Sequence, residues 1–126
     1  VLHFTEEQVW ALLEKYKVTP PVPYRLGWGR SSCMTCIFNS PKIWSTISTY
    51  YPERAQLIAG YEQKFDCTIS RSKIDVVSLS NRIEPFDIQD MEALVQSKIE
   101  SYYLPVFTDN WTVPPGAFNK EGCGSL

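Results

Sequence analysis

Two cysteines stand three positions apart in this chain, Cys33 and Cys36, directly behind the segment Leu26–Ser32, which contains two glycines and Arg30. Thiols at this spacing can hold one metal ion together or oxidise to a disulfide. A loop with glycines bends sharply, and a guanidinium presents a planar set of donors to phosphate or sulfate. The segment therefore predicts a site of sulfur or metal chemistry beside an anion-binding Arg30.

Two further cysteines extend this hypothesis. If the fold brings Cys67 and Cys123 to Cys33 and Cys36, the four sulfurs suit zinc or an iron–sulfur cluster. Cys67 follows an expected helix end, where a buried cysteine without a further role is an equal alternative. Cys123 lies between two glycines, which favours an accessible thiol that acts as a nucleophile or as another metal ligand. For the pair Cys33 and Cys36, metal ligation ranks ahead of a redox pair, and a redox pair ahead of inert burial.

Other polar residues carry weaker signals. Arg25 is a second candidate for binding an anion. For Arg25, however, the favoured interpretation is a solvated or salt-bridged loop residue. His3 is the single histidine, and neither a catalytic triad nor a metal site can be built around it. The carboxylates on the expected helices are interpreted as solvent-facing: Glu6, Glu7, Glu53 and Glu62.

The bulk properties narrow the class of protein. The length of 126 residues fits one domain that can bury a sizeable core. A formal net charge of -2 argues against a strongly basic surface for nucleic acid. No apolar run reaches the roughly 18 residues typical of a membrane-spanning helix, so we expect no membrane partner. With four cysteines and no secretory signal, we expect a reduced cytoplasmic setting, where paired cysteines are more often metal ligands or redox thiols than structural disulfides.

Helix-start signals divide the chain into short helices. The first helix starts at the capping box Thr5–Gln8, and the second at the N-cap Ser40, which is followed by Pro41. The third starts at Pro52, and the fourth is capped by Asp87 and is expected to run to Pro105. The second helix has the apolar stripe Ile43, Trp44, Ile47 and Tyr51, and the third has Leu57, Ile58, Tyr61 and Phe65. Residues 72–86 are expected to be irregular with a short strand.

These signals predict a mainly α fold. We expect one domain over residues 1–126 with four or five helices and long loops rich in proline and glycine. The C-terminal tail from Thr108 is expected to be anchored by Trp111, Val113 and Phe118.

Several segments together resemble a known family. Phe4–Trp10 is similar to the pattern W-[ST]-x-x-D-V-W, and Pro23–Phe38 to Y-x-x-G-x-x-R-x-x-C-x-x-C. Pro52–Arg54 and Pro115–Phe118 ahead of Gly122–Gly124 also fit. These patterns resemble phosphoadenosine phosphosulfate (PAPS) reductase-like proteins, in the phage and mobile-element branch akin to DNA phosphorothioation sulfurtransferases. The resemblance covers most of the chain and is weakest over residues 72–106.

The resemblance implies a part of an oxidoreductase or sulfurtransferase that acts on a sulfonucleotide or an adenylated substrate. An upstream α/β domain would bind the adenine nucleotide, because the family's S-G-G-x-D-S loop is not in this chain. We therefore expect the chain alone to be catalytically silent, with that domain as its partner and DNA-modification proteins as further candidates. Cys123 corresponds to the catalytic nucleophile, although Glu121–Leu126 differs from the family's E-C-G-L-H by an inserted Gly122 and a missing histidine.

Two alternatives stay open at this point. In one, the cysteines form a structural metal module, with zinc or an iron–sulfur cluster, that serves as an interaction platform for protein or DNA. In the other, the chain is a helical domain whose thiols have no role.

Overall fold

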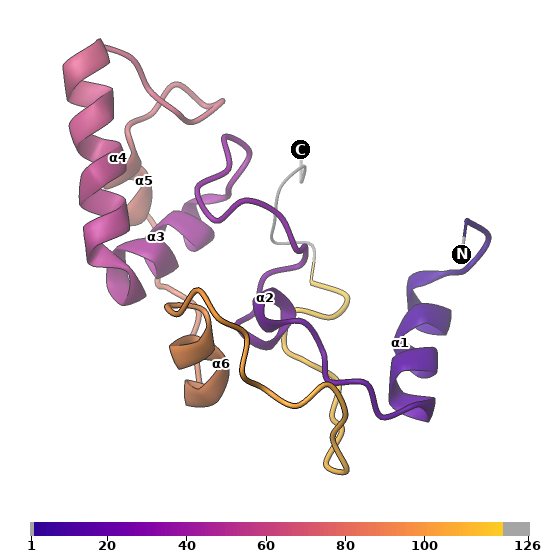
Figure 1. The fold of residues 1–126 in the computed structure, drawn as a ribbon. Coiled ribbons are helices and arrows are strands. Elements are labelled where there is room, and N and C mark those ends of the chain that lie inside the picture. Colours follow the sequence, from indigo (N-terminus) through magenta and orange to yellow (C-terminus); the bar gives the residue numbers. More distant parts are fainter. Residues whose placement is uncertain (1, 120–126) are drawn as a thin grey trace. The chain divides into compact units, whose positions relative to one another are not determined.

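The computed structural model describes residues 2–119, and within them the chain is mainly helical, as predicted. The helices are α1 (Glu6–Lys15), α2 (Val22–Arg25), α3 (Pro41–Tyr50), α4 (Pro52–Phe65), α5 (Val76–Ser80) and α6 (Met91–Gln96) (Figure 1). They outnumber the four or five expected because α2 and α5 contain only 4 and 5 residues. Across residues 2–119 there is no strand, only an isolated bridge between Val18 and Phe107. None of the helices in this part combines the length and apolarity needed to cross a membrane.

The described residues divide into two compact units. Unit 1 comprises residues 2–31 and 88–119 and contains α1, α2 and α6. Unit 2 comprises residues 32–87 and contains α3, α4 and α5. Each unit therefore has its own elements and its own buried side chains.

Helix α3 supplies most of the core of unit 2. Its N-cap, Ser40, accepts a hydrogen bond from the backbone N–H of Ile43 at 3.3 Å. Pro41 occupies the first helical position, where a missing N–H costs nothing. The predicted stripe is confirmed, because its four members are buried: Ile43, Trp44, Ile47 and Tyr51. Helix α3 packs against both α4 and α5.

Helix α4 begins at Pro52, as predicted, but buries a different face from the one expected. Three of the expected core residues have 46%, 47% and 63% of their surface exposed: Leu57, Tyr61 and Phe65. The buried residues of this helix are instead Ala55 and Glu62. The apolar stripe thus identified the helix correctly and its buried side wrongly.

Glu62 explains this choice of face. Its carboxylate accepts hydrogen bonds from the backbone N–H groups of Ile69 and Val76, both at 2.9 Å. Burying a carboxylate is unfavourable unless hydrogen bonds compensate it, and here two loop amides do so. The interpretation of Glu62 as solvent-facing is therefore wrong.

Helix α5 corrects the expectation of a short strand within residues 72–86. Asp75 is its N-cap, and the Asp75 side chain accepts a hydrogen bond from the backbone N–H of Ser78 at 2.8 Å. Val76 and Leu79 are buried, at the i, i+3 spacing of one helix face. The β-branched residues that suggested extended structure are accommodated in a helix because this cap and Glu62 fix where it begins.

In unit 1, α1 starts at the predicted capping box. Thr5 accepts a hydrogen bond from the backbone N–H of Gln8 at 3.3 Å, and the Gln8 side chain accepts one from the Thr5 N–H at 2.9 Å. Trp10 is the buried residue of this helix. Its ring meets Tyr24 of α2 edge to face, with centroids 5.0 Å apart.

Helix α6 starts later than predicted. Its N-cap is Asp90 rather than Asp87, and Asp90 Oδ1 accepts a hydrogen bond from the backbone N–H of Ala93 at 2.9 Å. The same carboxylate binds Arg25 of α2, with Arg25 Nε 2.7 Å from Oδ2. The helix therefore starts at Asp90 and not at Asp87, because the Asp90 carboxylate both caps the helix and pairs with a cation.

Helix α6 also ends earlier, at Gln96 instead of near Pro105. The buried Gln96 side chain donates to the carbonyl of Ser101 at 3.0 Å and accepts from the N–H of Tyr103 at 2.8 Å. These bonds turn the chain back on itself, so the apolar residues beyond Gln96 do not continue the helix.

The described part of the C-terminal tail belongs to unit 1. Trp111 is buried and its Nε1 donates to the carbonyl of Val18 at 2.9 Å, which confirms Trp111 as an anchor. Val113 and Phe118 are about half exposed, at 55% and 47%. The backbone N–H of Phe118 is held by Glu6 Oε1 at 3.2 Å, so a polar contact replaces the expected apolar one.

Candidate functional site

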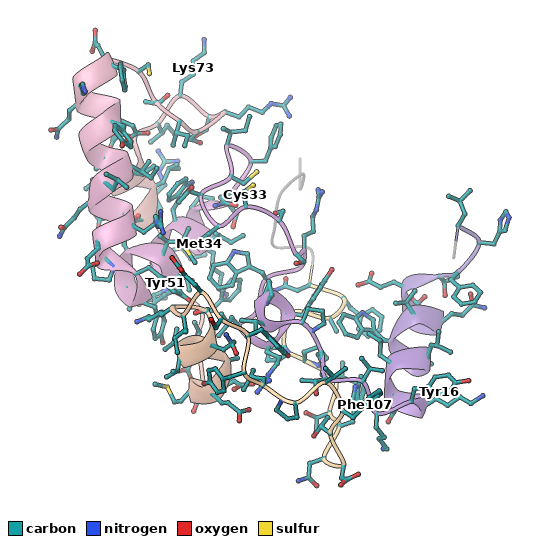
Figure 2. All side chains as sticks on the ribbon, in the orientation of Figure 1. Tyr16, Cys33, Met34, Tyr51, Lys73 and Phe107 are labelled. Carbon is teal, nitrogen blue, oxygen red and sulfur yellow. The ribbon has the colours of Figure 1, made fainter. Side chains whose placement is uncertain are left out.

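The loop with Cys33 and Cys36 lies in unit 2, directly before α3, and Figure 2 labels Cys33 and Met34 on it. Two turns follow each other here, the first with Met34 and Thr35 at its centre. The second is closed by a hydrogen bond from the Asn39 N–H to the carbonyl of Cys36 at 3.0 Å. The buried side chain of Asn39 also donates to the carbonyl of Met34 at 2.6 Å, which ties the second turn to the first.

The two thiols differ in accessibility. Cys33 is exposed, whereas Cys36 is partly buried. A β-turn keeps its first and fourth Cα atoms within about 7 Å, and a disulfide needs a Cα separation of about 4.4–6.8 Å. The turn from Cys33 to Cys36 therefore suits reversible disulfide formation, with Cys33 as the thiol open to a reaction partner.

The proposed metal ligands are only partly brought together. Cys67 is exposed just beyond the end of α4, and no group of three His, Cys, Asp or Glu residues within residues 2–119 is arranged to hold a metal ion. Cys67 thus does not join Cys33 and Cys36 as a third ligand. Cys123 lies outside the described residues. The described chain offers two thiols of a four-ligand set for zinc or an iron–sulfur cluster, so we derive no step through a metal.

Arg25 is engaged by carboxylates. Its Nε and one terminal nitrogen bind Asp90 at 2.7 and 3.0 Å, and a terminal nitrogen binds Glu92 at 2.8 Å. Partial burial lowers the pKa of Arg25, but the hydrogen bonds to Asp90 and Glu92 and their negative charge raise it overall. An anion would have to displace these carboxylates, so the salt-bridge alternative describes Arg25 in this structure, and anion binding stays a prediction.

Arg30 is exposed and follows a bend of the backbone in unit 1. Gly27 adopts φ 101°, in the left-handed region that side chains with a Cβ avoid, and its carbonyl accepts a hydrogen bond from the Asn119 side chain at 2.8 Å. Trp28 is buried beside this bend. Arg30 belongs to unit 1 and Cys33 to unit 2, so their cooperation stays a prediction from the sequence.

A groove of about 430 Å³ in unit 2 was not foreseen. Residues 37–41, which continue the cysteine loop, form one wall, and residues 70–72 form the other. The Arg71 N–H donates to the carbonyl of Ile37 at 3.1 Å, and the two loops lie side by side (Figure 1). No local signal marks this groove, because its walls are far apart in the sequence and meet through this hydrogen bond and the contact of Arg71 with the Phe38 ring.

Comparisons with known proteins gave no match: no family model, no curated protein and no solved structure matches the chain.

Proposed function

We propose that this chain is the thiol-bearing part of a PAPS reductase-like enzyme and that Cys33 and Cys36 supply two electrons for sulfonucleotide reduction or sulfur transfer. The observation that carries the proposal is the hydrogen-bonded double turn, which holds an exposed thiol and a partly buried thiol three positions apart. The motifs around this turn, from Leu26 to Cys36, are also those in which the chain resembles the family.

The chemistry balances for reduction. Oxidation of the Cys33 and Cys36 thiols to one disulfide releases two electrons and two protons. A sulfonucleotide that accepts the two electrons loses its sulfur–oxygen bond to the nucleotide phosphate and yields sulfite and the free nucleotide. In this proposal the Cys123 thiolate attacks the sulfur of the sulfonucleotide, the nucleotide leaves, and an S-sulfonate forms on Cys123. Cys33, as the exposed thiol, then attacks the Cys123 sulfur and releases sulfite, and Cys36 attacks Cys33 to complete the disulfide and release the Cys123 thiol.

Three further components belong to the proposal. An upstream α/β domain binds the adenine nucleotide, since the chain lacks the phosphate-gripping loop of the family. Cys123 is the nucleophile that the resemblance implies. Arg30 contacts the anionic group of the substrate, because a guanidinium is suited to phosphate and sulfate.

The test uses the protein in which this chain is joined to a nucleotide-binding domain, with sulfite release from PAPS as the readout. We expect Cys33→Ser and Cys36→Ser to reduce sulfite release about a hundredfold or more, because each leaves a single thiol that cannot form the intramolecular disulfide. Cys67→Ser is the matched control and should retain nearly full activity. Normal sulfite release by either Cys33→Ser or Cys36→Ser contradicts the proposal.

Elemental analysis of protein purified without oxygen separates this proposal from the structural metal module. That alternative requires stoichiometric zinc or iron and a large loss of stability on chelation, because metal binding and folding are coupled in such sites. Metal-free protein that melts unchanged with a chelator excludes the structural metal module.

A further inference from the structure

The groove in unit 2 contains two guanidinium groups without carboxylate partners. Arg71 and Arg82 both line it, and neither forms an ion pair within residues 2–119. Arg25 in unit 1, by contrast, is bound by Asp90 and Glu92. Two cations that share a concave surface without compensating charge make this groove favourable for an anion.

Arg71 is oriented by the ring beneath it. Its guanidinium carbon lies 5.7 Å from the centre of the Phe38 ring. A guanidinium that stacks on an aromatic face keeps its N–H donors at its edge, where they can bind an oxyanion through two parallel hydrogen bonds. This cation–π contact thus helps to hold Arg71 in place without occupying its N–H donors.

Hydroxyl groups add a further donor. Ser70 Oγ and Ser72 Oγ lie 2.8 Å apart, and the Ser72 N–H donates to Ser70 Oγ at 3.2 Å. The two hydroxyls have two protons, and the bond between them uses one. One hydroxyl proton therefore remains for a ligand in the groove, whichever serine is the donor.

The groove also has an exposed apolar part beside Asn39 and Ser40. Ile37 and Phe38 both line it and are 47% and 40% exposed. We propose that this groove binds a phosphate monoester whose organic part is apolar, with the phosphate on Arg71 and Arg82 and the organic part against Ile37 and Phe38. Two guanidinium groups match the charge of a phosphate dianion better than that of a singly charged sulfate ester.

This proposal does not depend on the thiol pair, and it is tested by binding alone. The probe is phenyl phosphate, titrated into the 126-residue chain at low ionic strength and followed by calorimetry. We expect saturable binding with one site, and about tenfold or greater weakening in Arg82→Gln, the loss expected for one charged hydrogen-bond partner. Inorganic phosphate should bind several-fold more weakly because it has no apolar part. Phenyl sulfate should also bind several-fold more weakly, because it carries a single negative charge.

Lys73 provides the control, since it is an exposed cation on the same loop but does not line the groove (Figure 2). Lys73→Gln should change the affinity less than twofold. Equal weakening by Lys73→Gln and Arg82→Gln would show general attraction to positive charge and overturn the proposal, as would the absence of saturable binding. Urea denaturation of each variant checks that unit 2 is folded. If Arg82→Gln is unfolded, the test passes to Arg71→Lys, which keeps the charge but loses the planar donors. Arg71→Lys must then weaken binding.

Discussion

The Oε2 atom of Glu62 accepts a hydrogen bond from the backbone N–H of Val76 at 2.9 Å, so a carboxylate in α4 helps to set where α5 begins. The other carboxylate oxygen accepts a hydrogen bond from the N–H of Ile69, also at 2.9 Å. One buried side chain thus holds both ends of the loop that carries Arg71. Glu62 thereby positions one wall of the groove as well as stabilising unit 2.

Glu62→Gln should lower the free energy of unfolding by about 1–3 kcal/mol, because the amide has one oxygen for two backbone donors and places an N–H against the other. Urea denaturation followed by circular dichroism measures this change. Glu53→Gln is the matched control, because Glu53 is exposed in the first turn of the same helix. This substitution should lower the free energy of unfolding by only about a few tenths of a kcal/mol. Equal effects of the two substitutions would refute the role of Glu62.

Gly116→Ala should destabilise unit 1 by about 1–3 kcal/mol. The Gly116 N–H donates to the Tyr24 carbonyl at 2.7 Å, and an added Cβ would lie only 2.7 Å from that oxygen and in collision with the Trp28 carbonyl. Backbone atoms cannot yield as a flexible side chain can. The change is measured as a shift in the midpoint of thermal unfolding.

Gly60→Ala is the control, because it makes the same substitution at a position where the added Cβ meets no other atoms. A Cβ at Gly60 in α4 has no neighbour within 4 Å. We expect this variant to be more stable than the parent by about 0.5–1 kcal/mol, since alanine favours a helix interior over glycine. A Gly116→Ala variant as stable as Gly60→Ala would contradict the close approach of the two segments.

Asp90 should make the stability of unit 1 depend on pH. Partial burial raises the pKa of Asp90, but hydrogen bonds from Arg25 and the Ala93 N–H and the guanidinium charge outweigh it and lower the pKa below the ordinary 3.8. A lowered pKa means that the ionised form stabilises the fold above about pH 4 and that this contribution is lost as the pH falls through the lower value.

The Asp90→Ala variant tests this dependence. At neutral pH it should lose about 0.5–2 kcal/mol, the usual contribution of an N-cap, and the difference from the parent should shrink below about pH 4. Urea denaturation at a series of pH values gives both quantities. Asp109→Ala, at an exposed position of the same unit, should show neither effect. A difference at Asp90 that stays constant to pH 2 would argue against the ionised contact.

The sequence predicted those elements whose signals are local. Thr5 with Gln8, and Ser40 with Ile43, are three residues apart, so the starts of α1 and α3 could be identified from residue types alone. The mainly helical class follows from such signals and from the apolar stripe of α3. The apolar stripes of α4 and α6 misled, because hydrogen bonds of Glu62 set the buried face of α4 and hydrogen bonds of Gln96 set the end of α6.

Contacts between distant residues could not be predicted. Glu62 meets Val76 across 14 positions, and Arg25 meets Asp90 across 65, and nothing local marks either pair. For the candidate site, the spacing of Cys33 and Cys36 was visible in the sequence, whereas the role of Asn39 in fixing the double turn was not. Arg71 and Arg82 went unnoticed because a groove exists only once the chain has folded.

If Cys33 and Cys36 act as one two-electron couple, a glutathione redox titration followed by alkylation and mass spectrometry will detect it. We expect one transition in which both thiols disappear together, with a tenfold change in the ratio of the reduced and oxidised forms for about every 30 mV. Cyanogen bromide cuts after Met34 and Met91, and in the oxidised sample the fragments 1–34 and 35–91 should stay linked through Cys33 and Cys36. Separate glutathione adducts on Cys33 and Cys36, with fragments 1–34 and 35–91 unlinked after cleavage, would contradict a shared disulfide.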